Sequence, residues 1–175
     1  VTGATSGTGS IGTVIQQTLT TTSVTASGTA VYTITPVLNG CPGTSETVTI
    51  TVNPTPEIIG NPTHAPICSG EFTNINVSAM DPTTVFDYTV SAVGVIGATG
   101  GTITAGAPIA QQLETISNSQ GYVDYIITPT LNGCSGTPIV IRVYVNPLPL
   151  PVLEDGVICV ELSTGLVFQS HHLDS

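Results

Sequence analysis

The four cysteines are the residues in this chain whose type and spacing are most suited to forming a specific bond. They occur in two contexts: Cys41 and Cys134 each follow an Asn-Gly pair, and Cys68 and Cys159 each follow an isoleucine. No Cys-x-x-Cys pair or neighbouring histidine completes a set of zinc ligands, so a zinc site is not expected. The thiols are therefore expected either to form disulfide bonds or to remain free and buried.

The histidines and carboxylates offer little for catalysis or metal binding. His171 and His172 have no acid placed beside them, His64 lies in a proline-rich loop, and all three are expected to be exposed. The acids expected in solvated loops are Glu57, Asp81, Asp87, Asp124, Glu154 and Asp155. Calcium needs six to eight converging oxygens, and no Asp-x-Asp-x-Asp loop is present. We expect no catalytic, cofactor or metal site, with calcium near Glu154 and Asp155 as the alternative.

The elements that must position these residues occur in two copies. Residues 28–54 match residues 121–147 without a gap, with 14 identities in 27 positions. The shared motif is Tyr-x-Ile-Thr-Pro-x-Leu-Asn-Gly-Cys-x-Gly, and Val-Asn-Pro ends both stretches. An internal repeat with an offset of 93 residues indicates one small domain copied in tandem, so fold and role should be considered for each unit.

Each copy of the motif predicts two strands joined by a tight turn. Apolar residues occupy every second position over 47–52 and 141–145, which is typical of a strand with one buried face. The Asn-Gly pairs at 39–40 and 132–133 readily take the positive φ angles of a hairpin turn. The residues expected to face inward in these strands are Tyr32, Ile34, Val48, Ile50, Val52, Val123, Tyr125, Ile127, Ile141, Val143 and Val145.

Further strands are predicted between the two copies of the motif. Alternation is clear at 73–79 and at 86–90, and shorter strands are expected near 93–96, 101–104 and 110–116. About seven short strands in about 93 residues, without helical periodicity, predict an all-β fold. The spacing favours an antiparallel β-sandwich of immunoglobulin-like type.

The repeat also predicts the domain boundaries. Residues 1–54 are expected to be the C-terminal part of one sandwich, 55–147 a complete sandwich, and 148–175 the start of a third, so that the chain would be a fragment of a longer protein. Both junctions, at 54–56 and 147–151, are rich in proline. Proline stiffens a linker toward extended geometry, so successive units are expected to form a semi-rigid rod.

Within these boundaries, each unit has one cysteine near its start and one in its hairpin. The favoured pairing joins Cys68 to Cys134 and leaves Cys41 and Cys159 to partners outside the chain. Closing so long a loop would stabilise the unit by about 4 kcal/mol through chain entropy, which suits a small exported domain. The alternative joins Cys41 to Cys68 and Cys134 to Cys159 across the two junctions, and free thiols are the third possibility.

Composition excludes several classes of function. Charged residues make up 7% of the chain, the net charge is −10, and Arg142 is the only basic residue besides the histidines, whereas ordinary domains are about one quarter charged. Nucleic-acid binding is excluded because nothing can neutralise phosphates, and binding to anionic membranes is disfavoured. No apolar run approaches the roughly 20 residues of a membrane-spanning helix, so membrane insertion is not expected.

These motifs carry a resemblance to known repeats. Ile-Cys-Ser-Gly at 67–70, the hairpin motif, Val-Asn-Pro-x-Pro, and the opening of the third unit at 151–159 resemble the PKD-like and immunoglobulin-like repeats of giant Bacteroidota surface proteins, in particular the SprB-type gliding-motility adhesins. The resemblance implies export through the type IX secretion translocon and display at the outer cell surface.

Two functions are compatible with these features. The favoured one is a non-catalytic stalk or adhesive repeat of a very large adhesin that binds a surface polysaccharide or another extracellular ligand. The scarcity of Lys and Arg fits an exposed filament, because it removes trypsin-type cleavage sites. The alternative is a carbohydrate-binding accessory module of a secreted polysaccharide-degrading enzyme. Such modules usually display aromatic platforms, but Trp is absent and only Tyr122 and Tyr144 are expected to point outward.

Overall fold

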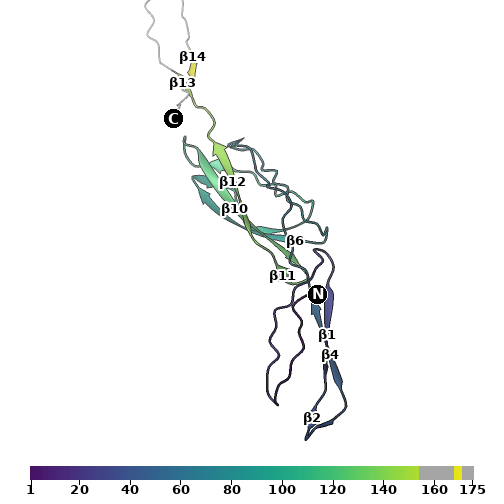
Figure 1. The fold of residues 1–175 in the computed structure, drawn as a ribbon. Helices are drawn as coiled ribbons and strands as arrows, with labels where there is room; N and C mark the ends of the chain where they lie inside the picture. Colours follow the sequence, from purple (N-terminus) through teal and green to yellow (C-terminus); the bar gives the residue numbers. More distant parts are fainter. Residues whose placement is uncertain (154–167, 171–175) are drawn as a thin grey trace, which may run out of the picture.

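The larger sheet of the molecule confirms the predicted all-β fold. The computed structural model describes residues 1–153 and 168–170, and these residues form strands and no helix. The sheet has the strand order β5-β12-β10-β6-β8, with β11 paired to β10 (Figure 1). Its strands are β5 (Ile67–Cys68), β6 (Val85–Val93), β8 (Gly101–Thr104), β10 (Gly121–Leu131), β11 (Cys134–Ser135) and β12 (Ile139–Asn146). All neighbours are antiparallel except β5, which runs parallel to β12.

Strands β10 and β12 form the centre of this sheet. They pair in a register that places Tyr125 opposite Ile141. The predicted turn is confirmed, since Asn132 and Gly133 both have positive φ angles, of 49° and 80°. Positive φ at both central residues gives the turn the twist of the flanking strands. The hairpin thus brings the inward residues of both strands onto one face.

A second, less regular layer covers that face. It consists of β7 (Val95–Ile96), β9 (Glu114–Thr115) and the chain around residues 71–79. The predicted strand at 73–79 has the predicted faces but makes only isolated bridges, such as Ile75 with Ile109. The Thr73 hydroxyl donates to the Ile109 carbonyl and accepts from the backbone amide of Gln111. A side chain thus replaces part of the regular backbone hydrogen bonding between strands.

The two layers enclose one apolar core, as expected for an immunoglobulin-like sandwich. Its largest fully buried side chains are Tyr125 and Phe86. The core residues are Ile67, Ile75, Val77, Phe86, Val95, Ile109, Leu113, Val123, Tyr125, Ile127, Ile141, Val143 and Val145. The strand alternation therefore predicted the buried face of this unit correctly.

The first copy of the motif forms a separate hairpin. It consists of β1 (Gly28–Ile34) and β4 (Glu46–Val52), extended by β2 (Val37–Leu38) and β3 (Cys41–Pro42), with the same Asn-Gly turn. The residues predicted to face inward share one face, but Ile34, Val48 and Ile50 are exposed and Tyr32 is half-buried in the described residues. The strands face as predicted, but no second layer equivalent to residues 71–79 packs on them within the described part of the chain.

The linker between the two copies is packed against the complete unit. Pro54 and Pro56 are buried, and the Asn53 side-chain amide donates a 2.9 Å hydrogen bond to the Asn132 carbonyl in the β10–β11 turn. A β-carbon at Gly136 would overlap the Pro56 carbonyl oxygen, so only glycine permits this approach. The two copies lie end to end in Figure 1.

After the larger sheet, β13 (Pro151–Leu153) pairs with β14 (Phe168–Ser170). Among the described residues, no helix is long and apolar enough to cross a membrane.

We expect Tyr125→Ala to destabilise the protein by about 3–5 kcal/mol, because it removes a fully buried aromatic side chain. Asp124→Ala should cost no more than about 1 kcal/mol, because it removes an exposed ion pair. Chemical denaturation followed by far-ultraviolet circular dichroism measures both. Equal shifts in the midpoint would mean that β10 faces the other way.

Candidate functional site

The structure separates the two cysteines that were predicted to pair. Cys68 in β5 lies opposite Asn146, at the end of β12. Cys134 pairs with Leu131 before β12 begins. The eight residues of β12 span about 26 Å, whereas a disulfide requires Cα atoms within about 7 Å. The predicted Cys68–Cys134 bridge is therefore wrong for this fold, and both residues are free thiols. The reason is that β5 adds in parallel at the far end of the hairpin.

The alternative pairing of Cys41 with Cys68 across the first junction is also incompatible with the structure. Cys41 is a free, exposed thiol in β3, at the tip of the first hairpin. The linker joins that hairpin to the turn of the complete unit at Asn132, and Cys68 lies at the opposite end of β12. Cys41 and Cys68 are thus separated by the lengths of both hairpins. Cys159 lies outside the described residues, so its partner remains a prediction, as does a partner for Cys41 outside the chain.

His64 has a structural role that the sequence did not predict. Its ring is half-buried rather than exposed. Nε2 accepts a 3.0 Å hydrogen bond from the Asn74 amide, which leaves Nδ1 as the protonated nitrogen that donates to the Ala65 carbonyl at 2.7 Å. The imidazole therefore fastens its loop to the second layer. His171 and His172 lie outside the described residues.

The carboxylates do not assemble into a site in the described part of the chain. The hydroxyl and amide of Thr83 both donate to Asp81 and lower the pKa of its carboxyl. Asp87 accepts a 2.7 Å hydrogen bond from Thr102, and Glu57 is exposed. Residues 1–153 and 168–170 contain no group of three or more His, Cys, Asp or Glu side chains that could hold a metal ion. Glu154 and Asp155, proposed above for calcium, lie outside these ranges.

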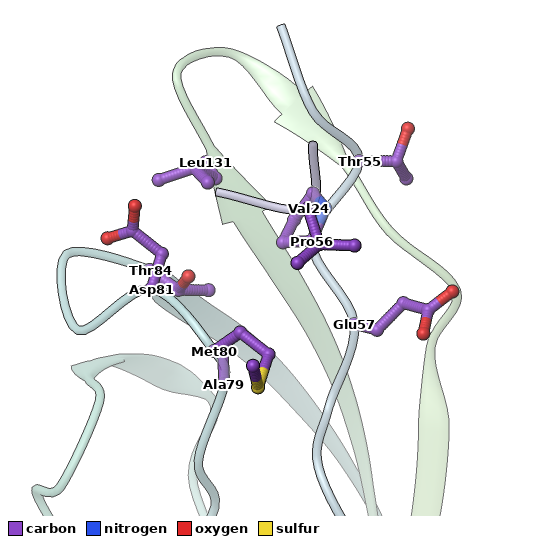
Figure 2. A pocket seen from close by; sticks show the side chains of 9 residues that line it. All are labelled: Val24, Thr55, Pro56, Glu57, Ala79, Met80, Asp81, Thr84 and Leu131. Atoms are coloured by element: carbon purple, nitrogen blue, oxygen red, sulfur yellow. The ribbon is translucent and has the colours of Figure 1, made fainter. Parts of the chain in front are cut away.

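A small cavity lies at the junction between the two copies (Figure 2). Its volume is about 80 Å³, below the roughly 300 Å³ of the smallest usual ligand sites. It is lined by Val24, Thr55, Pro56, Glu57, Ala79, Met80, Asp81, Thr84 and Leu131. The carboxyl groups of Glu57 and Asp81 point to opposite sides in Figure 2. The cavity thus has room for a few water molecules but presents no converging ligands.

The most distinctive surface feature is a cross-strand cluster on the outer face of β10 and β12. Asp124 accepts two 2.7 Å hydrogen bonds from Arg142, from Nε and from Nη2. The Arg142 guanidinium carbon lies 4.0 Å from the ring centroid of Tyr122, a cation–π contact. Tyr144 meets Tyr122 edge to face, with ring centroids 6.3 Å apart. The hydrogen bonds between Asp124 and Arg142 lower the pKa of the Asp124 carboxyl and raise the pKa of the Arg142 guanidinium.

This cluster belongs to the complete unit alone. At the equivalent positions of β1 and β4 the first copy has Thr29, Val31, Thr49 and Thr51. Tyr122 and Tyr144 lie on the outer face as predicted, with Tyr144 exposed and Tyr122 half-buried. Because the ion pair and the cation–π contact already engage the guanidinium, the cluster serves first to hold the two strands together.

A repeated polar contact was not predicted. The Tyr125 hydroxyl donates to Gln111 Oε1 at 3.0 Å, and Gln111 Nε2 donates to the Thr99 carbonyl at 2.7 Å. The first copy repeats both bonds with Tyr32, Gln17 and Thr5, each at 2.7 Å. Burial raises the pKa of Tyr125 to about 12, so this hydroxyl keeps its proton well above neutral pH.

The sequence does contain a signal for this contact. Ile-x-Gln-x-Leu occurs at 15–19 and again at 109–113, at an offset of 94 residues. The hairpin motif repeats at 93, so an ungapped comparison misses the match by one position.

The repeated geometry agrees with a family comparison. Residues 1–56 and 65–149 match the family described as PKD-like domain. The chain belongs to the PKD-like domain family. Each matched stretch contains one copy of the hairpin and of the Tyr–Gln–Thr contact. PKD-like domains are typically non-catalytic modules and are generally found in extracellular or surface proteins. No curated protein matches the chain.

We expect Cys68 and Cys134 to react with a maleimide reagent in the folded protein purified without reductant, because neither can reach the other. Peptide mapping under non-reducing conditions identifies the labelled residues. Recovery of a Cys68–Cys134 cross-linked peptide from correctly folded monomer would contradict the strand order described above.

The stability contributed by Asp124 should depend on pH. The pKa of its carboxyl is lowered in the folded state, so its contribution is present above the unfolded value of about 3.9 and is lost as the pH falls through the lower folded value. Asp124→Asn should thus cost at most about 1 kcal/mol at pH 7, and the difference should shrink toward pH 2. A difference that stays constant over this range would show that the charge has no role.

Proposed function

We propose that this PKD-like chain forms part of the non-catalytic stalk of a very large secreted cell-surface adhesin. Its role would be to hold a binding region away from the cell, in gliding motility or surface attachment, after export through the type IX secretion translocon. The observation that supports this most is the packed junction. Buried linker prolines and the Asn53–Asn132 hydrogen bond join consecutive copies of the hairpin with little slack.

The repeated contacts support the same proposal. Both copies keep the Asn-Gly turn, the Tyr–Gln–Thr contact and a glycine amide that donates to the carbonyl of the proline preceding the turn. The outer faces differ, being rich in threonine in one copy and carrying the Arg142 cluster in the other. The two copies therefore share the contacts that hold the hairpin together and not their surface residues, which suits a structural spacer.

One observation favours the second candidate, a carbohydrate-binding accessory module. Tyr122, Tyr144 and the Asp124–Arg142 pair combine aromatic surface with hydrogen-bonding groups on one exposed face. The rings meet edge to face at an interplanar angle of 62°, so they do not form the flat platform on which sugar rings stack. We therefore rank this candidate second.

Small-angle X-ray scattering tests the stalk directly. A protein of three consecutive copies of residues 55–147 should have a maximum dimension of roughly 100 Å or more, because the sandwiches join end to end. A compact globule of that length would be about 50 Å across, and this result would contradict the proposal.

A matched variant isolates the role of the junction. Gly136→Ala places a β-carbon against the Pro56 carbonyl and should broaden the distribution of distances between units. Gly106→Ala, in the turn after β8 and with open space around it, should strain only its own turn and leave that distribution unchanged, because Gly106 does not contact the linker.

A further inference from the structure

The complete unit carries one cysteine at each of its two ends. Cys134 lies in β11, directly after the turn that contacts the linker from the preceding copy (Figure 1). Cys68 lies in β5, opposite Asn146, at the end where the chain leaves the unit. Both are free thiols, and neither is fully buried. When units follow one another end to end, the cysteine at the end of one unit therefore shares a junction with the cysteine at the start of the next.

The first junction shows which residues meet where two copies join. At one end of the contact, the Asn53 side-chain amide donates to the Asn132 carbonyl at 2.9 Å. At the other end, the Pro56 carbonyl oxygen lies so close to Gly136 that a β-carbon there would overlap it. Cys134 stands in the sequence between these two contacts. The linker that leaves the first copy therefore passes beside Cys134.

Asn146, at the other end of the complete unit, is held in the same way as Asn53. The two residues are counterparts in the repeat, and each is followed by Pro-x-Pro. Asn53 Oδ1 accepts a 2.7 Å hydrogen bond from Ser27, and Asn146 Oδ1 accepts a 2.6 Å bond from Gln120, the counterpart of Ser27. Both bonds leave the side-chain amide as a donor, and that of Asn146 has no acceptor among the described residues. The end of the complete unit thus offers the donor that Asn53 uses at the first junction.

This equivalence brings two cysteines to one asparagine. Cys68 lies opposite Asn146 in the neighbouring strand, and neighbouring strands are about 4.8 Å apart. A following unit that docks as the complete unit docks on the first copy places its Asn-Gly-Cys turn against Asn146. Its cysteine is then two residues, at most about 7 Å, from the turn asparagine that accepts the hydrogen bond. Both thiols therefore lie within a residue or two of the same Asn–Asn hydrogen bond, on the scale of the roughly 7 Å between Cα atoms that a disulfide allows.

We propose that a disulfide joins Cys68 of one unit to the cysteine equivalent to Cys134 in the unit that follows, so that consecutive units are cross-linked at their junction. The inference rests on the end-to-end array proposed above. Within one unit β12 keeps the two cysteines apart, whereas a bond between units uses both cysteines of each unit.

The bond requires an oxidant. As the S–S bond forms, two thiols lose two protons and two electrons. A small-molecule disulfide such as oxidised glutathione accepts them and is reduced to two thiols. Disulfides form in this way in the oxidising compartments that exported proteins reach.

Thiol counting and non-reducing peptide mapping test the proposal on residues 1–147 followed by a second copy of residues 55–147, which contain a whole core. The protein is folded in a buffer of reduced and oxidised glutathione. It has five thiols, Cys41 and two in each copy of the complete unit. We expect the monomer to lose two of them and to yield one cross-linked peptide that contains Cys68 and Cys134. Five free thiols in the folded monomer would overturn the proposal.

Matched serine variants identify the copy from which each cysteine comes, because the two copies have the same sequence. Cys134→Ser in the first copy with Cys68→Ser in the second leaves the two cysteines that meet at the new junction, and the bridge should be retained. Cys68→Ser in the first copy with Cys134→Ser in the second leaves the two outer cysteines, and the bridge should be lost. Equal cross-linking in both variants would contradict the proposed pairing.

Small-angle X-ray scattering of the same protein separates this proposal from the stalk function. An extended particle that contains the bridge supports both. An extended particle without the bridge would overturn the cross-link and leave the stalk standing. A compact particle would overturn the end-to-end array, and the cross-link with it.

Discussion

The pairing of β10 with β12 is the interaction on which the rest of the structure depends. Its register aligns Tyr125 and Ile141 on one face and Asp124 and Arg142 on the other, so it creates both the core and the surface cluster. Its turn receives the linker from the preceding copy through Asn132. Its far end holds β5. The first hairpin repeats this pairing in the same register, from Gly28 opposite Val52 to Ile34 opposite Glu46.

Much of the fold could be predicted from two local sequence patterns, the alternation of apolar residues in strands and the Asn-Gly turns. The period-two alternation predicted the inward residues of β10 and β12, and the Asn-Gly pairs predicted both turns, because these are effects between near neighbours. The second layer was less predictable. The Thr73 side chain replaces ladder bonds there, and no alternation pattern reveals that a hydroxyl will do so. The parallel pairing of β5 with β12 could not be predicted from the sequence either, because it depends on how a long connection crosses the unit.

The candidate sites show the same division between local and long-range effects. Tyr122 and Tyr144 could be assigned to the outer face from strand parity alone. The cysteine pairing failed because membership of one unit says nothing about distance within it, and Cys68 and Cys134 lie at opposite ends of β12. The Tyr125–Gln111 contact was missed because the two motifs repeat at offsets that differ by one residue.

The parallel alignment of β5 with β12 has a mechanical consequence. The chain enters the complete unit at Pro56, beside the β10–β11 turn, and leaves it after Asn146, at the other end. Tension along the molecule therefore pulls the segment leading to β5 and the end of β12 in opposite directions along the same line. The hydrogen bonds between them then carry the load together, in shear, instead of opening one after another.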